Sequence, residues 1–153
     1  QELDQPDLTV SILSRLREFN LGKMEGMAFT AVQAAYPTEF DAFRNHPDQY
    51  DPTAIQGESF QQLVKRMLPA VHQIIAANPR REDNVLIVSH GAALNALINT
   101  MLGASLATLR DRGGLSNTST TMLETRDRGK SYKLLLWNDT SYLSRQPDAT
   151  DTI

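Results

Sequence analysis

One short hydrophobic run in the chain ends at a histidine and a glycine. Residues 85–88 read Val-Leu-Ile-Val, and His90-Gly91 lies just beyond them. A short apolar run bounded by turn residues is typical of a buried strand. Small and apolar residues then recur at helical spacing over residues 92–102, and Gly103 is well placed to end a helix. The pattern predicts a strand that delivers His90 to its carboxyl end and a helix that begins beside it.

The clearest amphipathic pattern lies earlier in the chain. A helix is predicted to begin at residues 57–59 (Gly-Glu-Ser) and to end at the turn and charged residues 78–84. Pro69 lies inside it and should bend it, because proline removes one backbone hydrogen bond. His72 falls near the edge of the apolar stripe, so we expect it on the helix surface. The stripe consists of Phe60, Leu63, Val64, Met67, Leu68, Val71, Ile74 and Ile75.

The amino-terminal third of the chain has weaker patterns. Residues 8–13 alternate and are rich in β-branched side chains, which predicts a short strand near a sheet edge. Residues 16–26 contain two glycines and no sustained period, so they should form a loop. Short helical pieces are expected over residues 28–45, with a break at Pro37. The proline-flanked segment 46–52 could cover a pocket, but an ordinary connection is the favoured interpretation.

The carboxyl-terminal third is predicted to contain a hairpin. Residues 118–124 and 132–137 are rich in β-branched, apolar and aromatic residues, as strands are. Residues 127–130 (Asp-Arg-Gly-Lys) lie between them and favour a tight turn. The polar residues 144–153 should be a frayed tail.

Composition narrows the class of protein. The 153 residues are 41% hydrophobic and 22% charged, which suits a single domain over residues 1–153. The net charge of -3 and the lack of a basic stripe argue against nucleic-acid binding. No apolar run is long enough to cross a membrane, and the chain opens on polar, acidic residues instead of a signal peptide. We therefore expect a cytoplasmic protein that binds neither nucleic acid nor membrane.

His90 is the first candidate for chemistry. At the helix start, the backbone N–H groups of Gly91 and Ala92 would be unpaired and could bind an anion. The His90 imidazole could donate a further hydrogen bond to the same anion. The other interpretation is that His90 only ends a strand, and spacing alone leaves both open. Glu18 and Glu58 are the carboxylates that the fold could bring close, since one lies in a loop and the other at a helix start. A histidine that stabilises a phosphoryl group and a carboxylic acid that protonates a leaving oxygen suit phosphoester chemistry.

Other chemistries find little support. The three histidines have no metal-ligand spacing, and cysteine is absent, so we expect neither a metal site nor any other cofactor. The chain contains no Gly-x-Ser-x-Gly nucleophile motif, no P-loop and no dinucleotide fingerprint.

Several stretches together resemble the histidine phosphatase superfamily, the phosphoglycerate-mutase-like enzymes. Residues 16–26 are similar to the family's L-x-E-x-x-x-G-x-W-E-G segment, with Met24 at the usual Trp. Residues 57–59 are similar to its G-E-S helix start, and residues 85–91 to its second-histidine strand. Residues 115–119 and 137–140 are similar to its closing strands. The ordered set spans nearly the whole chain, which makes it more specific than any single motif.

The resemblance implies a fold and roles for residues. The fold would be a three-layer α/β/α sandwich around a mostly parallel sheet. Glu18 matches the proton donor, and His90 matches the second histidine, which contacts the phosphoryl group in transit. Glu58 matches a recurrent residue beside the phosphate pocket and would have a supporting role. The substrate would be a small phosphorylated molecule.

The sequence departs from the family pattern at its start. The family's nucleophile is the histidine of an Arg-His-Gly motif on the first strand, whereas the only His-Gly here is His90-Gly91. The corresponding strand, helix and strand are missing, which would leave open sheet edges and an uncovered apolar face. Either a preceding segment of a longer protein or a second chain would complete the sheet, or the chain is a truncated, non-catalytic relative.

Three functions follow from this resemblance. The first is a phosphatase of small phosphoesters that acts through a phosphohistidine, with its nucleophile outside this chain. The short loop at 46–56 and the segment at 16–26 favour a phosphatase over a phosphoglycerate mutase, which is the second. The third is a module that binds phosphate or a partner without catalysis.

Overall fold

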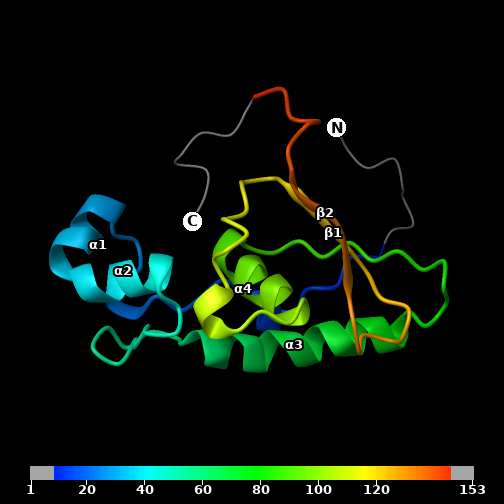
Figure 1. Ribbon diagram of the computed structural model, residues 1–153, viewed down its shortest axis with the longest axis horizontal. Helices are drawn as coiled ribbons and strands as arrows, with labels where there is room; N and C mark the ends of the chain where they lie inside the picture. The colour runs from blue at the N-terminus through cyan, green and yellow to red at the C-terminus, as the bar shows by residue number, and fades with distance from the viewer. Residues whose placement is uncertain (1–8, 146–153) are drawn as a thin grey trace.

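The computed structural model describes residues 9–145 (Figure 1). These residues form α-helices, short 3-10 helices and a β-hairpin. The α-helices are α1 (Phe29–Ala35), α2 (Pro37–Asn45), α3 (Phe60–Ala77) and α4 (Gly91–Met101); the 3-10 helices are η1 (Ser14–Leu16), η2 (Gly22–Met24) and η3 (Leu106–Thr108); the strands are β1 (Thr120–Glu124) and β2 (Lys133–Asp139).

Helix α3 is the longest helix (Figure 1), and α4 and η1 pack against it. A capping box fixes its start, because the Ser59 side chain accepts from the Gln62 N–H at 3.2 Å and the Gln62 side chain accepts from the Ser59 N–H at 2.8 Å. Of the predicted apolar stripe, Phe60, Leu63, Met67 and Val71 are buried, and the other members, Val64, Leu68, Ile74 and Ile75, are half-buried. Pro69 lies inside the helix, and His72 is exposed on its surface, also as predicted.

Helix α4 packs against α3 and is almost wholly buried. Small side chains at Ala93 and Ala96 let the two helices approach closely, since neither alanine exposes more than 1% of its surface. Gly103 follows the last turn with φ of +84°, a left-handed conformation that ends helices and favours glycine. The predicted helix over residues 92–102 is therefore confirmed.

An aromatic cluster joins the amino-terminal loop to α2 and α3. The rings of Phe19, Phe43, Tyr50 and Phe60 pack with centroids 5.0–5.6 Å apart. The segment after α2 contributes to this core through Tyr50 and the fully buried Ile55, so it packs inward as part of the fold. The break at Pro37 between α1 and α2 is as predicted.

The predicted hairpin is confirmed. Strands β1 and β2 pair antiparallel, with Leu123 opposite Leu134 and Glu124 opposite Lys133. The turn between them places Arg128 and Gly129 at positive φ, +60° and +82°. Because β1 ends at Glu124 and β2 begins at Lys133, the connection spans residues 125–132 and is longer than the tight turn predicted at residues 127–130.

Two other predicted strands are absent. Residues 9–13 and 85–89 form no strand, and Leu8 lies outside the described residues. A strand exists only when a neighbour completes its backbone hydrogen bonds, and the only sheet in residues 9–145 is the β1–β2 pair. The apolar run that predicted the central strand is instead largely open to solvent, with Leu86 75% and Val88 83% exposed. The described residues thus form an α/β fold that lacks the expected mostly parallel sheet.

Two further expectations concern the chain ends and the membrane. Of the expected tail at 144–153, residues 146–153 lie outside the described residues. Within residues 9–145, no helix combines the length and the apolar character that a membrane crossing requires.

Candidate active site

Glu18 lies at the amino-terminal end of α4. Its Oε1 accepts hydrogen bonds from the Ala93 N–H at 2.8 Å and the Phe19 N–H at 2.9 Å, and its Oε2 accepts from the Ala92 N–H at 3.3 Å. These helical N–H groups have no partner within the helix. The Glu18 carboxylate therefore caps α4 from a distant part of the sequence and shows that this helix end accepts an anion.

His90 occupies the N-cap position of the same helix. Its backbone is extended, with φ of -114° and ψ of 155°, and its side chain makes no capping hydrogen bond. The imidazole is exposed. The structure thus brings together the two residues that the sequence singled out as acid and phosphate ligand, although they are far apart in the chain. Gly91 and Ala92 form the first turn beside them, and Ala92 N–H is already bonded to Glu18.

The Glu58 carboxylate is bound by Arg66. Arg66 donates from Nε to Glu58 Oε1 at 2.6 Å and from Nη2 to Glu58 Oε2 at 2.8 Å, and the Asn20 N–H donates to Oε2 at 3.3 Å. The Glu58 side chain is 11% exposed and that of Arg66 15%. Both carboxylate oxygens are occupied, so in this structure Glu58 holds protein groups and not a substrate.

Arg66 also holds the backbone of the loop that carries Glu18. Its Nη1 donates to the carbonyl oxygens of Arg15 and Arg17 at 2.7 and 2.9 Å, and its Nη2 donates to that of Glu18 at 2.8 Å. One guanidinium thus ties the carbonyls of three loop residues to Glu58. Charge-assisted hydrogen bonds of this kind are the stronger ones in proteins, so the pair fixes where Glu18 lies.

The same loop is held at its other end by backbone pairing. The Glu58 N–H donates to the Asn20 carbonyl at 2.7 Å, and the Lys23 N–H donates to the Ile55 carbonyl at 2.8 Å. Gly22 has φ of +57°, and a Cβ atom there would lie 2.0 Å from the Ile55 oxygen. Only glycine permits this close approach, so the loop needs Gly22 to dock.

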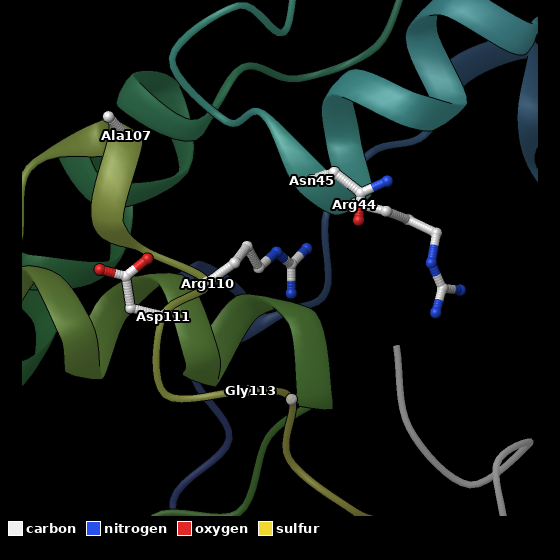
Figure 2. Close-up of a pocket in the computed structure, with 7 residues that line it drawn as sticks. Arg44, Asn45, Ala107, Arg110, Asp111 and Gly113 are labelled. Carbon is white, nitrogen blue, oxygen red and sulfur yellow. The ribbon is translucent and has the colours of Figure 1, made fainter.

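A cavity of about 370 Å³ lies beside this helix end and is shown in Figure 2. Arg44 from α2 and Arg110 from the segment after η3 both line it. Burial and, to a lesser extent, the charge of Arg44 lower the pKa of Arg110 to about 10, while the charge of Glu18 acts in the opposite direction. Arg110 stays protonated at neutral pH and is close enough to Glu18 to feel its charge.

Within residues 9–145, no three His, Cys, Asp or Glu side chains gather closely enough to hold a metal ion. The groups gathered near the amino-terminal end of α4 are the carboxyl group of Glu18, the imidazole of His90 and nearby guanidinium groups. Such a set can bind an anion and transfer protons.

Sequence reasoning missed the arginines. Arg66, Arg44 and Arg110 follow no motif, and their partners come from other elements. The one available signal was the spacing of Glu58 and Arg66, which lie two helical turns apart at the start of a predicted helix.

The sequence was compared with protein families and with curated proteins, and it is similar to phosphatases. The sequence model of the histidine phosphatase superfamily, branch 1, matches residues 2–140. A glucosyl-3-phosphoglycerate phosphatase of Mycolicibacterium vanbaalenii is 31% identical over 151 residues, which cover 88% of this chain and 65% of that protein. A metal-independent phosphoserine phosphatase of Arabidopsis thaliana is 30% identical over 129 residues, covering 84% and 50%.

The fold is also similar to those of solved phosphatase structures. A mycobacterial glucosyl-3-phosphoglycerate phosphatase in complex with inorganic phosphate superposes with a TM-score of 0.75 at 27% identity, covering 86% of this chain and 66% of that one. The chain spans between 12% and 65% of the length of the first curated relatives that it matches. The family match confirms the resemblance read from the sequence: the chain belongs to the histidine phosphatase superfamily.

Proposed function

We propose that the protein containing this chain is a phosphatase that hydrolyses small phosphoesters through a phosphohistidine intermediate. The proposal rests on one observation: Glu18 and His90 both lie at the amino-terminal end of α4, where the backbone N–H groups of Ala92 and Ala93 donate to the Glu18 carboxylate. The proposal is supported by relatives that are named as phosphatases. The cytoplasmic location and the independence from metal stay predictions.

Each residue has a role in two balanced steps. The nucleophilic histidine lies on a segment outside this chain, since the 153 residues contain no Arg-His-Gly. Its imidazole nitrogen attacks phosphorus, the ester P–O bond breaks, and Glu18 gives its proton to the leaving oxygen. Water then attacks the phosphorus of the phosphohistidine, Glu18 takes a proton from that water, the P–N bond breaks, and phosphate and the free histidine are released. His90 and the Gly91 N–H at the start of α4 stabilise the phosphoryl oxygens in both steps, whereas the Ala92 N–H, also expected to bind phosphate, is bonded to Glu18 in this structure.

Glu58 supports this site without touching substrate. Its oxygens accept from Arg66, which in turn binds the carbonyls of residues 15, 17 and 18. Loss of this pair would release the Glu18 loop, so we assign Glu58 a positioning role.

A further segment, from the same protein or from a second chain, completes the sheet. Large apolar side chains are exposed in residues 9–13, in residues 85–88 and on the hairpin, at Val10, Ile12, Leu86, Val88, Met122 and Leu135. Exposed apolar side chains in this number favour a covering partner. With an added strand beside residues 85–88, the fold would become the mostly parallel three-layer sandwich of the family.

The second candidate is a non-catalytic module that binds phosphate, and the missing Arg-His-Gly favours it for this chain alone. A phosphoglycerate mutase is the less favoured alternative, because the curated relatives reported above are named as phosphatases.

The test compares the 153-residue chain with the same chain extended upstream to include Arg-His-Gly. We expect p-nitrophenyl phosphate to be hydrolysed by the extended protein only, with an acid-labile phosphoryl group on its added histidine. His90→Ala in the extended protein should lower turnover about 100-fold or more, the scale of a lost transition-state contact. Normal turnover by the 153 residues alone, verified by intact mass, would overturn the claim that the nucleophile lies elsewhere.

A further inference from the structure

The segment that leads into His90 has few contacts to fix its position. Residues 85–89 form no strand, and only Ile87 among them packs against the core of the described residues. The hydroxyl of Ser89 donates to the carbonyl oxygen of Leu16 at 2.5 Å, and within residues 9–145 this is the one hydrogen bond that the segment makes. The side chain directly before His90 therefore joins it to a distant part of the chain.

Leu16 belongs to the loop that carries the candidate acid. Arg66 binds the carbonyl oxygens of residues 15, 17 and 18, and Ser89 binds the carbonyl oxygen of Leu16 between them. Four consecutive carbonyl groups of this loop thus accept hydrogen bonds from side chains. The bonds of Arg66 hold the loop on α3, whereas the bond of Ser89 holds it on the segment before His90.

The loop has another connection to α4, and that connection runs through an ionisable group. The Glu18 carboxylate accepts from the N–H groups of Ala92 and Ala93. An ionised carboxylate is a strong acceptor, whereas a protonated carboxyl group is a weaker one and has become a donor at one oxygen. This connection is therefore weakest when Glu18 holds the proton for the leaving group. The bond between Ser89 and Leu16 joins two groups that stay neutral, so it is equally available in both states.

We propose that Ser89 is a positioning residue for the proposed reaction, because its hydroxyl keeps the loop of Glu18 in place beside His90 while Glu18 is protonated. This inference rests on the proposed function, which takes Glu18 as the acid. Ser89 takes part in neither proton nor phosphoryl transfer and acts through the backbone of Leu16. Loss of its hydroxyl should displace Glu18 more than His90, whose carbonyl is still held in α4 by the Leu94 N–H at 2.9 Å.

The test compares Ser89→Val with Ser89→Thr in the extended protein. The two side chains have nearly the same shape, and only threonine keeps a hydroxyl. We expect Ser89→Val to lower kcat for an alkyl phosphate about tenfold, the scale of one lost hydrogen bond. With p-nitrophenyl phosphate the loss should be less than about twofold, because nitrophenolate leaves without a proton. Ser89→Thr should restore the rate with the alkyl phosphate. Ser144→Val, at an exposed serine, is the matched control and should keep both rates.

The two substrates separate a positioning role from general damage. An equal loss of kcat with both substrates, no loss with either, or the same loss in Ser89→Thr as in Ser89→Val would each overturn this inference alone. An unmodified extended protein without turnover would overturn the proposed function and this inference with it.

Amide hydrogen exchange in the 153-residue chain tests the connection without catalysis. Glu18→Gln imitates the neutral carboxyl group, and the probe is the Asn20 N–H, whose acceptor on Glu58 neither substitution removes. We expect exchange in the double variant Glu18→Gln, Ser89→Val to exceed the product of the two single effects about threefold or more, because each connection compensates for loss of the other. An effect equal to the product would contradict the proposed role of Ser89.

Discussion

At the scale of single residues, Glu18 has two tasks that compete for one carboxylate. It satisfies the N–H groups of Ala92 and Ala93, which the N-cap residue His90 leaves unpaired. In the proposed reaction the same group donates a proton to the leaving oxygen. Both tasks need Glu18 held at the helix end, and the contacts of Arg66 with the loop backbone provide this.

Glu18→Gln separates the two tasks. Glutamine keeps an oxygen acceptor for α4 but cannot supply the acid proton. In the extended protein we expect kcat for an alkyl phosphate to fall about 100-fold or more, the usual contribution of general acid catalysis. Turnover of p-nitrophenyl phosphate should fall much less, since nitrophenolate leaves without a proton.

Steady-state kinetics with both substrates measure this difference. Glu82→Gln, at an exposed glutamate away from α4, serves as the control and should leave both rates unchanged. An equal loss with both substrates would argue against an acid role for Glu18.

At the scale of elements, α3 combines core packing with positioning of the site. Its apolar stripe forms the floor of the core, and Arg66 on another face binds Glu58 and the Glu18 loop. The capping box at Ser59 fixes the first turn, directly after Glu58. Local fraying at this helix start would therefore reach the candidate site.

Ser59→Ala removes one half of the capping box. We expect the free energy of unfolding of the 153-residue chain to fall by about 1 kcal/mol, because the Gln62 N–H loses its acceptor. Urea denaturation measures the change. Ser11→Ala, at an exposed serine outside any element, is the matched control. A midpoint for Ser59→Ala that equals the control would show that α3 does not depend on this cap.

At the scale of the whole molecule, several large apolar side chains of the described residues are exposed to solvent. Leu86 and Val88 expose most of their surface, and the hairpin exposes Met122 and Leu135. Helices α3 and α4 bury their apolar faces against each other, whereas only Ile87 of residues 85–88 packs against the core of the described residues, and Val85, Leu86 and Val88 are exposed. The proposed completing segment would cover these exposed apolar side chains.

Leu86→Asp tests for a covering segment. Leu86 is 75% exposed, so the substitution should change the stability of the 153-residue chain by less than about 0.5 kcal/mol. In the extended protein the aspartate would be buried without a partner, and we expect a loss of about 2 kcal/mol or more.

Urea denaturation of both lengths gives the comparison. Ala76→Asp, at an exposed position of α3, is the control and should have the same small effect in both. Equal effects of Leu86→Asp in the two lengths would mean that nothing covers residues 85–88.

The sequence alone predicted the features that depend on local bonds. Helices α3 and α4 and the β1–β2 hairpin follow from the apolar period, from capping residues and from the turn-forming residues between the strands, all of which act within a few positions. The family could also be recognised, because its motifs keep their order along the chain. These local patterns and the order of the motifs can be read without knowing which distant segments pack against each other in the fold.

Only the tertiary structure decided the rest. Residues 85–88 have a strand pattern but no strand, since strand hydrogen bonds need a neighbour that local sequence does not supply. Glu18 reaches the N–H groups of α4 from more than 70 positions away, and Arg66 reaches the Glu18 carbonyl from 48. Contacts of such range depend on how the helices pack, and so the candidate site emerged only from the fold.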